Sequence, residues 1–273
     1  MIRTVKATHI WGEIEATTRT RPLRVECLDA AGERFDVYVK LLARSDMGTN
    51  LFVSETLCGS FAQLLSLKVP EPLAVEFPHE MLPALTNRQI ADDIMNSGNL
   101  QFGSKSLGPG WHTAGGVPQR MRRKEDLADA LVILLMDLIA ENGDRSENNP
   151  NLMISAKGLA PIDHELAFSN FPFTEGDLAP FRPWEPAFLA QAKTRIERHL
   201  LFKTLSGRQL DFAAAGDRFK NVTPSALRAL IGKIPEPWVN LDSPPNRITR
   251  YLVEARKNMP TLLQILEHTL RRP

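Results

Sequence analysis

The sequence of 273 residues has little cysteine, no long apolar run and no apolar core of signal-peptide length in its first residues. Cys27 and Cys58 are too few for a disulfide framework and lack the spacing of a metal site, so we expect a reducing, cytoplasmic compartment. The longest apolar run, Ala130 to Met136, is ended by Asp137 and is far too short to span a bilayer. The N-terminal residues lack the apolar core of a signal peptide. We therefore expect no association with a membrane.

The sequence also lacks an excess of either charge. It has 33 Lys and Arg against 32 Asp and Glu, a formal net charge of +1. This balance argues against a protein that binds nucleic acid directly through a global basic field. The hydrophobic fraction of 43% is that of a folded globular protein, and the length suits one large domain or two lobes. The charge is not uniform, because residues 141–167 are acidic and the segment after residue 246 is basic.

Hydrophobic periodicity divides the chain into a strand-rich part and a helix-rich part. In the strand Arg34–Leu42, alternation places Asp36, Tyr38 and Lys40 on one face. We expect further strands at 24–28, 73–77, 99–107, 152–154 and 159–162. We expect helices at 51–65, 87–95, 124–141, 185–204, 207–214, 224–232 and 246–268. The turn-rich segment Gly108–Val117 is a plausible boundary. This order predicts an α+β protein with two lobes.

Three places along the chain contain candidate catalytic or ligand-binding residues. Lys40 lies on a strand, and Glu55 follows fifteen residues later in a helix. Asp144 and Asn149, five residues apart, lie in a polar loop after an apolar helix, and Asp163 ends the small hairpin beyond. Phosphoryl transfer needs a lysine for nucleotide phosphates, an acid to hold that lysine, a carboxylate at the attacking hydroxyl, and hard oxygen ligands for magnesium.

Each place alone also has a simpler interpretation. A strand lysine before a helical glutamate is usually a surface pair. A loop rich in Asn and Asp is most often a turn in which these side chains bind their own backbone. An Asp after a strand commonly ends that strand or caps a helix. Only the order of the three places, with these strands and helices between them, favours a catalytic site.

Five segments of the sequence resemble one known family. The segments are VYVKLL, LFVSETLCGSFAQLL, VPEP, NGDRSENNPNLMI and APIDHELAF. They resemble the HipA-like kinases, in particular their short single-domain branch, and they are more distantly similar to the type II phosphatidylinositol kinases. The resemblance covers roughly residues 10–170. It implies a two-lobed protein-kinase-like fold, with a small β-rich N-lobe with one helix at 1–105 and a larger, mostly helical C-lobe at 106–273.

The resemblance also implies a role for each candidate residue. Lys40 would contact the α- and β-phosphates of ATP, and Glu55 would pair with Lys40. Asp144 would be the catalytic base, while Asn149 and Asp163 would bind Mg²⁺. The strand at 99–107 would be the hinge that binds adenine.

The sequence departs from the protein-kinase pattern in two places, and it leaves the choice of one metal ligand open. No Gly-x-Gly-x-x-Gly loop precedes Lys40, and the matching region Ala16–Pro22 has no glycine, so Thr hydroxyls, backbone amides or Arg19 and Arg21 would have to hold the phosphates. The triplet Asp163-His164-Glu165 stands where protein kinases have Asp-Phe-Gly. Asn151 is an alternative to Asn149 as the metal ligand, and the spacing favours Asn149.

The sequence therefore predicts an ATP- and Mg²⁺-dependent kinase that modifies a Ser or Thr hydroxyl of a protein, which could be the kinase itself. One alternative is a binding or regulatory module with this fold and little catalysis. Another is a kinase whose acceptor is a small molecule or a lipid headgroup. The family resemblance also suggests an antitoxin-like regulatory protein partner.

Overall fold

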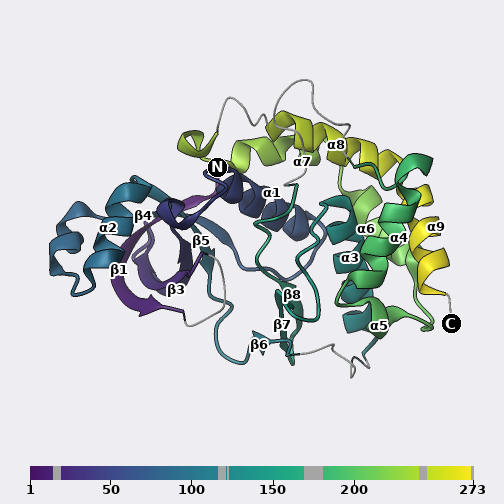
Figure 1. The fold of residues 1–273 in the computed structure, drawn as a ribbon, viewed down its shortest axis with the longest axis horizontal. Helices are drawn as coiled ribbons and strands as arrows, with labels where there is room; N and C mark the ends of the chain where they lie inside the picture. The colour runs from purple at the N-terminus through teal and green to yellow at the C-terminus, as the bar shows by residue number, and fades with distance from the viewer. Residues whose placement is uncertain (15–19, 116–120, 122, 169–180, 240–244, 272–273) are drawn as a thin grey trace.

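The computed structural model describes residues 1–14, 20–115, 121, 123–168, 181–239 and 245–271. Its strands gather in the N-terminal part of the chain and its helices dominate the C-terminal part, as Figure 1 shows. The α+β class and the two-part organisation expected from the sequence are confirmed.

The N-terminal part is built on a five-stranded barrel. Its strands are β1 (Arg3–Glu13), β2 (Leu23–Leu28), β3 (Arg34–Lys40), β4 (Pro72–Glu76) and β5 (Leu100–Lys105), in the closed order β1-β2-β3-β5-β4. β1 and β4 pair in parallel and close the barrel. A Cβ atom on Gly103 would lie 2.6 Å from both Val37 and Val75, so only glycine fits at this point of the interior.

Two α-helices accompany the barrel. α1 (Asn50–Leu64) has buried residues from Leu51 to Ala62 and lies between the barrel and the helical part (Figure 1). α2 (Arg88–Ser97), expected at 87–95, starts where the Asn87 side chain accepts a hydrogen bond from the backbone N–H of Ile90. Two short 3-10 helices, η1 (Leu42–Arg44) and η2 (His79–Ala84), complete this part.

The C-terminal part begins with a buried helix and a small sheet. α3 (Lys124–Ile139) is buried from Ala130 onward. The sheet consists of β6 (His112–Thr113), β7 (Leu152–Ser155) and β8 (Gly158–Pro161) in the order β6-β7-β8. β6 lies in the turn-rich segment Gly108–Val117, where its two residues pair with β7.

Helices make up the rest of the chain. They are η3 (Pro186–Phe188), α4 (Leu189–Arg198), α5 (Phe202–Leu205), α6 (Phe212–Asn221), α7 (Pro224–Ala229), η4 (Leu230–Lys233), η5 (Glu236–Trp238), α8 (Pro245–Lys257) and α9 (Met259–Leu270). No helix in the described part of the chain is both long enough and apolar enough to cross a bilayer.

Three of the expected helices differ in the structure. The helix expected at 246–268 is two helices, because Pro260 lacks an N–H and starts the first turn of α9. The helix expected at 207–214 starts only at residue 212, where the Asp211 side chain caps it. The helix expected at 185–204 is divided because His199 adopts an extended conformation between α4 and α5.

The two parts of the chain share a buried contact. The ring of Trp238 in η5 lies 5.0 Å from that of Phe52 in α1. The indole N–H of Trp238 donates to the backbone carbonyl of Leu100 at the start of β5, at 3.1 Å. The helical part is thereby joined to the barrel.

Candidate active site

One lysine lies at the centre of the candidate site. The Nζ atom of Lys40, at the end of β3, lies 2.7 Å from Oε1 of Glu55 in α1 and 2.6 Å from Oδ1 of Asp163. It also lies 2.8 Å from Oε2 of Glu165. Three carboxylates from two segments that are distant in sequence therefore converge on one ammonium group.

This cluster is buried, so its charges depend on one another. Lys40 is 8% exposed and Glu55 is 3% exposed. Burial lowers the pKa of the Lys40 ammonium, but the three carboxylates outweigh burial and hold that pKa above its usual value. Burial raises the pKa of Glu55, but Lys40 and His164 outweigh it and hold that pKa well below its usual value. Both groups are charged at neutral pH.

Glu55 also connects α1 with the segment after β8. Its second carboxylate oxygen, Oε2, accepts the backbone N–H of His164 at 3.0 Å. Asp163 adopts a positive φ of 55°, which turns the chain so that its carboxylate reaches Lys40. The order of β3, α1 and the β7–β8 hairpin therefore brings Lys40, Glu55 and Asp163 together.

The polar loop after α3 is organised around Asp144. Its Oδ2 atom accepts hydrogen bonds from the side-chain amides of Asn149, at 2.8 Å, and Asn151, at 2.9 Å. Asn151 has a φ of 42°, in the left-handed region that asparagine tolerates. Both asparagines use the amide nitrogen on Asp144, so the side-chain oxygen of either is the atom that could bind a metal ion.

A buried ion pair supports this loop from behind. The Arg145 side chain, 1% exposed, donates from Nε to Oδ2 of Asp137 in α3 at 2.6 Å. It also donates to the backbone carbonyl of Asn151 and, at 3.3 Å, to that of Ile162. Arg145 therefore ties the Asp144 loop to the chain just before Asp163.

A cleft of about 470 Å³, which we call the Lys40 cleft, lies beside these residues. The expected residues Lys40, Glu55, Asn149 and Asp163 all line it. Asp144 does not line it, although it binds Asn149 directly. Apolar side chains of Tyr38, Pro70, Trp111 and Met153 line other parts of the Lys40 cleft. The cleft therefore offers a wide apolar surface next to a charged end.

The expected phosphate-holding segment falls largely outside the described residues, since residues 15–19 are not among them. Of the residues expected there, Arg19 lies outside, while Arg21 is described and its Nη1 lies 3.8 Å from a carboxylate oxygen of Glu13.

The donor set beside Lys40 fits magnesium. Asn149 and Asp163 offer amide and carboxylate oxygens, the hard ligands that Mg²⁺ prefers. The described residues contain no group of three or more His, Cys, Asp and Glu side chains that could enclose a metal ion. Magnesium does not require one, because it is commonly held by one or two protein side chains together with phosphate oxygens and water.

The sequence profile of HipA-like kinases matches residues 15–178, more than half of the chain. The chain belongs to the HipA-like kinase family. No curated protein sequence matches it. Its fold is similar to that of the proinflammatory kinase CtkA of Helicobacter pylori, with a TM-score of 0.51 and 11% identity, over 98% of this chain and 100% of CtkA.

A weaker similarity concerns the MAP kinase LmaMPK10 of Leishmania major, with a TM-score of 0.29 and 11% identity over 95% of this chain and 83% of that one. The likeness to CtkA confirms the kinase-like fold of this HipA-like kinase.

Sequence reasoning about this HipA-like kinase missed two features of the site. Glu165 was not assigned a role, although its place two residues after Asp163 was the available signal. The cluster of Asp137, Arg145 and His199 was also missed, although an Asp within an otherwise apolar buried helix signals a buried partner.

Proposed function

We propose that this HipA-like kinase uses ATP and Mg²⁺ and transfers the γ-phosphoryl group to a Ser or Thr hydroxyl of a protein, which could be the kinase itself. The observation that carries the proposal is the convergence of Lys40, Glu55, Asn149 and Asp163 on one cleft, with Asp144 bound to Asn149. These are the side chains that phosphoryl transfer requires.

Each residue has one task in this proposal. Lys40 binds the α- and β-phosphates, and Glu55 holds the lysine in position. Asp144 orients the acceptor hydroxyl and accepts its proton. Asn149 and Asp163 hold Mg²⁺, which when bound neutralises charge on the phosphates. Tyr38 and Trp111 supply apolar surface for the adenine, whose edge would bind the backbone around β5.

The proposal divides the chain into an N-lobe at 1–105 and a C-lobe at 106–273, with the nucleotide between them. It places the protein in the cytoplasm, with an antitoxin-like protein as a regulatory partner. The family membership supports the kinase activity, whereas the choice of a protein hydroxyl rests on resemblance alone. A small-molecule or lipid acceptor would use the same residues.

A second candidate function is nucleotide binding with little catalysis. The observation that favours it is the contact between Lys40 and Glu165, since a carboxylate occupies the lysine that should bind phosphates. The glycine-free segment before Lys40 points the same way.

Two measurements separate the candidates. Radiolabelled ATP with magnesium tests transfer to the protein itself or to proteins of a bacterial lysate. A thermal-shift titration tests binding, because a ligand of the folded state raises the melting temperature. The kinase proposal expects magnesium-dependent stabilisation by ATP together with labelling that Asp144→Asn and Asp163→Asn each abolish. Stabilisation without labelling favours the binding module, and unchanged labelling in both variants contradicts the assignment of the site.

A further inference from the structure

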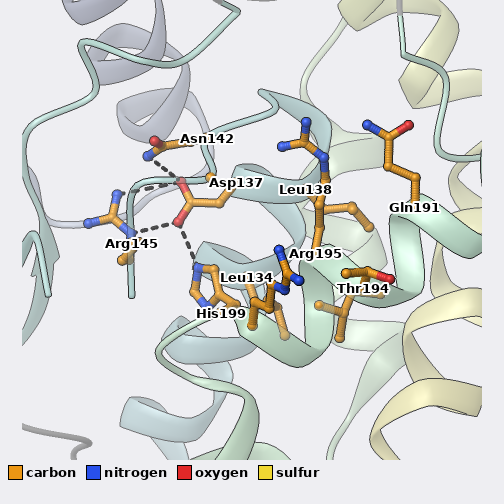
Figure 2. A pocket seen from close by; sticks show the side chains of 12 residues that line it. Leu134, Asp137, Leu138, Asn142, Arg145, Gln191, Thr194, Arg195 and His199 are labelled. Carbon is orange, nitrogen blue, oxygen red and sulfur yellow. Dashed lines mark hydrogen bonds and ion pairs between the residues drawn. The ribbon is translucent and has the colours of Figure 1, made fainter. Parts of the chain in front are cut away.

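A second cavity lies behind the Asp144 loop. It has a volume of about 390 Å³ and lies between α3, residues 142–145 and α4, as Figure 2 shows. We call it the α3–α4 cavity. A space of this size is in the range of small-molecule sites. None of its lining residues lines the Lys40 cleft.

The carboxylate in its lining is already neutralised. Asp137 accepts hydrogen bonds from Asn142 at 3.1 Å and Arg145 at 2.6 Å, and its Oδ2 lies 3.0 Å from Nε2 of His199 (Figure 2). Nδ1 of His199 accepts the backbone N–H of Leu201, so Nε2 carries the proton that Asp137 accepts. The negative charge of Asp137 is therefore balanced by Arg145, and His199 is neutral in this arrangement.

Because Asp137 and Arg145 balance each other, the charge of the α3–α4 cavity depends on two arginines of α4. Arg195 and Arg198 are three residues apart, so they lie on the same face of α4, and both line the cavity. Within the described part of the chain, neither guanidinium forms an ion pair with a carboxylate, and that of Arg195 lies over the ring of Phe181, 4.9 Å from its centroid. Burial raises the pKa of the neighbouring Glu141 to about 7, which limits how far its charge offsets that of Arg195. The lining therefore carries an excess of positive charge.

Arg195 lies directly against the Asp144 loop. Its Nη1 donates to the backbone carbonyl of Glu141 at 3.3 Å and would lie 3.4 Å from a Cβ atom on Gly143. Its Nε is buried and has no acceptor among the described residues. A buried donor without an acceptor costs free energy, which an anion or water can recover.

Other residues of the lining offer a hydrogen-bond acceptor and apolar contacts. The side-chain oxygen of Asn142, in a residue that is 4% exposed, is buried without a donor among the described residues. Leu134, Leu138 and Ile196 supply apolar wall. A ligand that fits all of these features has a dianionic group, a hydrogen-bond donor and a small apolar part.

We propose that the α3–α4 cavity is a binding site for a small phosphate monoester, held by Arg195 and Arg198. A phosphate monoester carries nearly two negative charges at pH 7 and so matches two guanidinium groups better than a carboxylate does. The ligand would press on Asn142 and Gly143, which immediately precede Asp144. The site lies next to this loop and shares no lining residue with the Lys40 cleft, so its existence does not depend on the reaction proposed there.

Isothermal titration calorimetry of the full chain with glycerol phosphate tests the proposal, with acetate as the monoanionic comparison at equal ionic strength. We expect saturable binding of glycerol phosphate and binding at least about tenfold weaker in Arg198→Gln and in Arg195→Gln, because each loses a charge-assisted hydrogen bond. Arg198 is exposed, so its variant keeps the test valid if Arg195→Gln fails to fold.

Two controls separate this site from its surroundings. Arg250→Gln removes an exposed arginine on α8 and should leave the affinity unchanged. Saturating ATP with magnesium, which fills the Lys40 cleft under the proposed function, should also leave it unchanged. The proposal is overturned if the wild type shows no saturable binding, or if acetate binds as tightly. It is also overturned if Arg195→Gln and Arg198→Gln both keep the wild-type affinity, or if ATP with magnesium abolishes binding.

Discussion

The ammonium group of Lys40 and the carboxylate of Glu165 form an ion pair, with 2.8 Å between Nζ and Oε2. The side chains are 10% and 12% exposed, so the pair is largely shielded from water. Burial raises the pKa of Glu165, while Lys40 lowers it. A nucleotide phosphate that binds Lys40 must share this lysine with Glu165 or displace it.

We therefore expect Glu165→Gln to bind ATP more tightly than the wild type. Removing the competing charge should improve the dissociation constant by about fivefold, or about 1 kcal/mol. Calorimetric titration with ATP, with and without magnesium, measures this. The exposed Glu80→Gln is the matched control and should change nothing. Weaker binding of Glu165→Gln in magnesium alone would instead make Glu165 a metal ligand.

The two asparagines bound to Asp144 should differ in their response to magnesium. Asn149→Ala removes a proposed metal ligand, so we expect the magnesium concentration for half-maximal activity to rise at least about tenfold. Asn151 has a positive φ, which alanine tolerates less well, and its buried side chain donates to Asp144, so Asn151→Ala should instead lower stability. A magnesium titration of the two variants, with melting curves, measures both effects. The reversed pattern would assign Asn151 as the ligand.

The ion pair of Arg145 and Asp137 should be essential to the fold. Arg145→Gln leaves a buried, unbalanced carboxylate, so the free energy of unfolding should fall by about 3 to 5 kcal/mol. Urea denaturation measures this, with the exposed Arg250→Gln as a control that should change stability by less than about 0.5 kcal/mol. A loss below about 1 kcal/mol in Arg145→Gln would show that the pair is dispensable.

The buried Glu141 should make stability depend on pH. Burial raises its pKa from 4.5 to about 7, with a smaller opposite effect of Arg195. Between these two values the folded state holds more protons than the unfolded chain, so stability falls as pH rises through this window. The loss from this residue should be roughly 2 to 3 kcal/mol.

Urea denaturation at pH 5 and pH 8 tests this with wild type and Glu141→Gln. The variant cannot ionise at this position, so its stability should fall less between the two pH values. Comparing the two differences removes the contribution of all other titrating groups. Equal differences would mean that Glu141 has an ordinary pKa in the folded protein.

The sequence predicted the strands and helices that carry the site better than the strand pairing that closes the barrel. The strand with Lys40, the helix with Glu55 and the hairpin before Asp163 each show a local pattern, and their order indicated a kinase-like arrangement. The parallel pairing of β1 with β4 has no local pattern, because it joins strands that are distant in sequence. The barrel could not be predicted for this reason.

Polar contacts between residues distant in the sequence could not be predicted either. His199 lies 62 residues after Asp137, and nothing in the periodicity of either segment connects them. Glu165 was missed although it follows Asp163 by two residues, because the direction of its side chain depends on the left-handed backbone of Asp163. The N-termini of α6 at Asp211 and of α9 at Pro260 could have been predicted, since both residue types are common at helix N-termini.

Phosphoryl transfer from radiolabelled ATP by Asp144→Asn, with nucleotide binding measured on the same sample, tests the central claim most directly. Asp144 does not line the Lys40 cleft, so the variant should bind ATP with magnesium as the wild type does. Its labelling should fall by at least about a hundredfold, because the acceptor hydroxyl loses its base. Labelling equal to that of the wild type, with binding intact, would contradict the account.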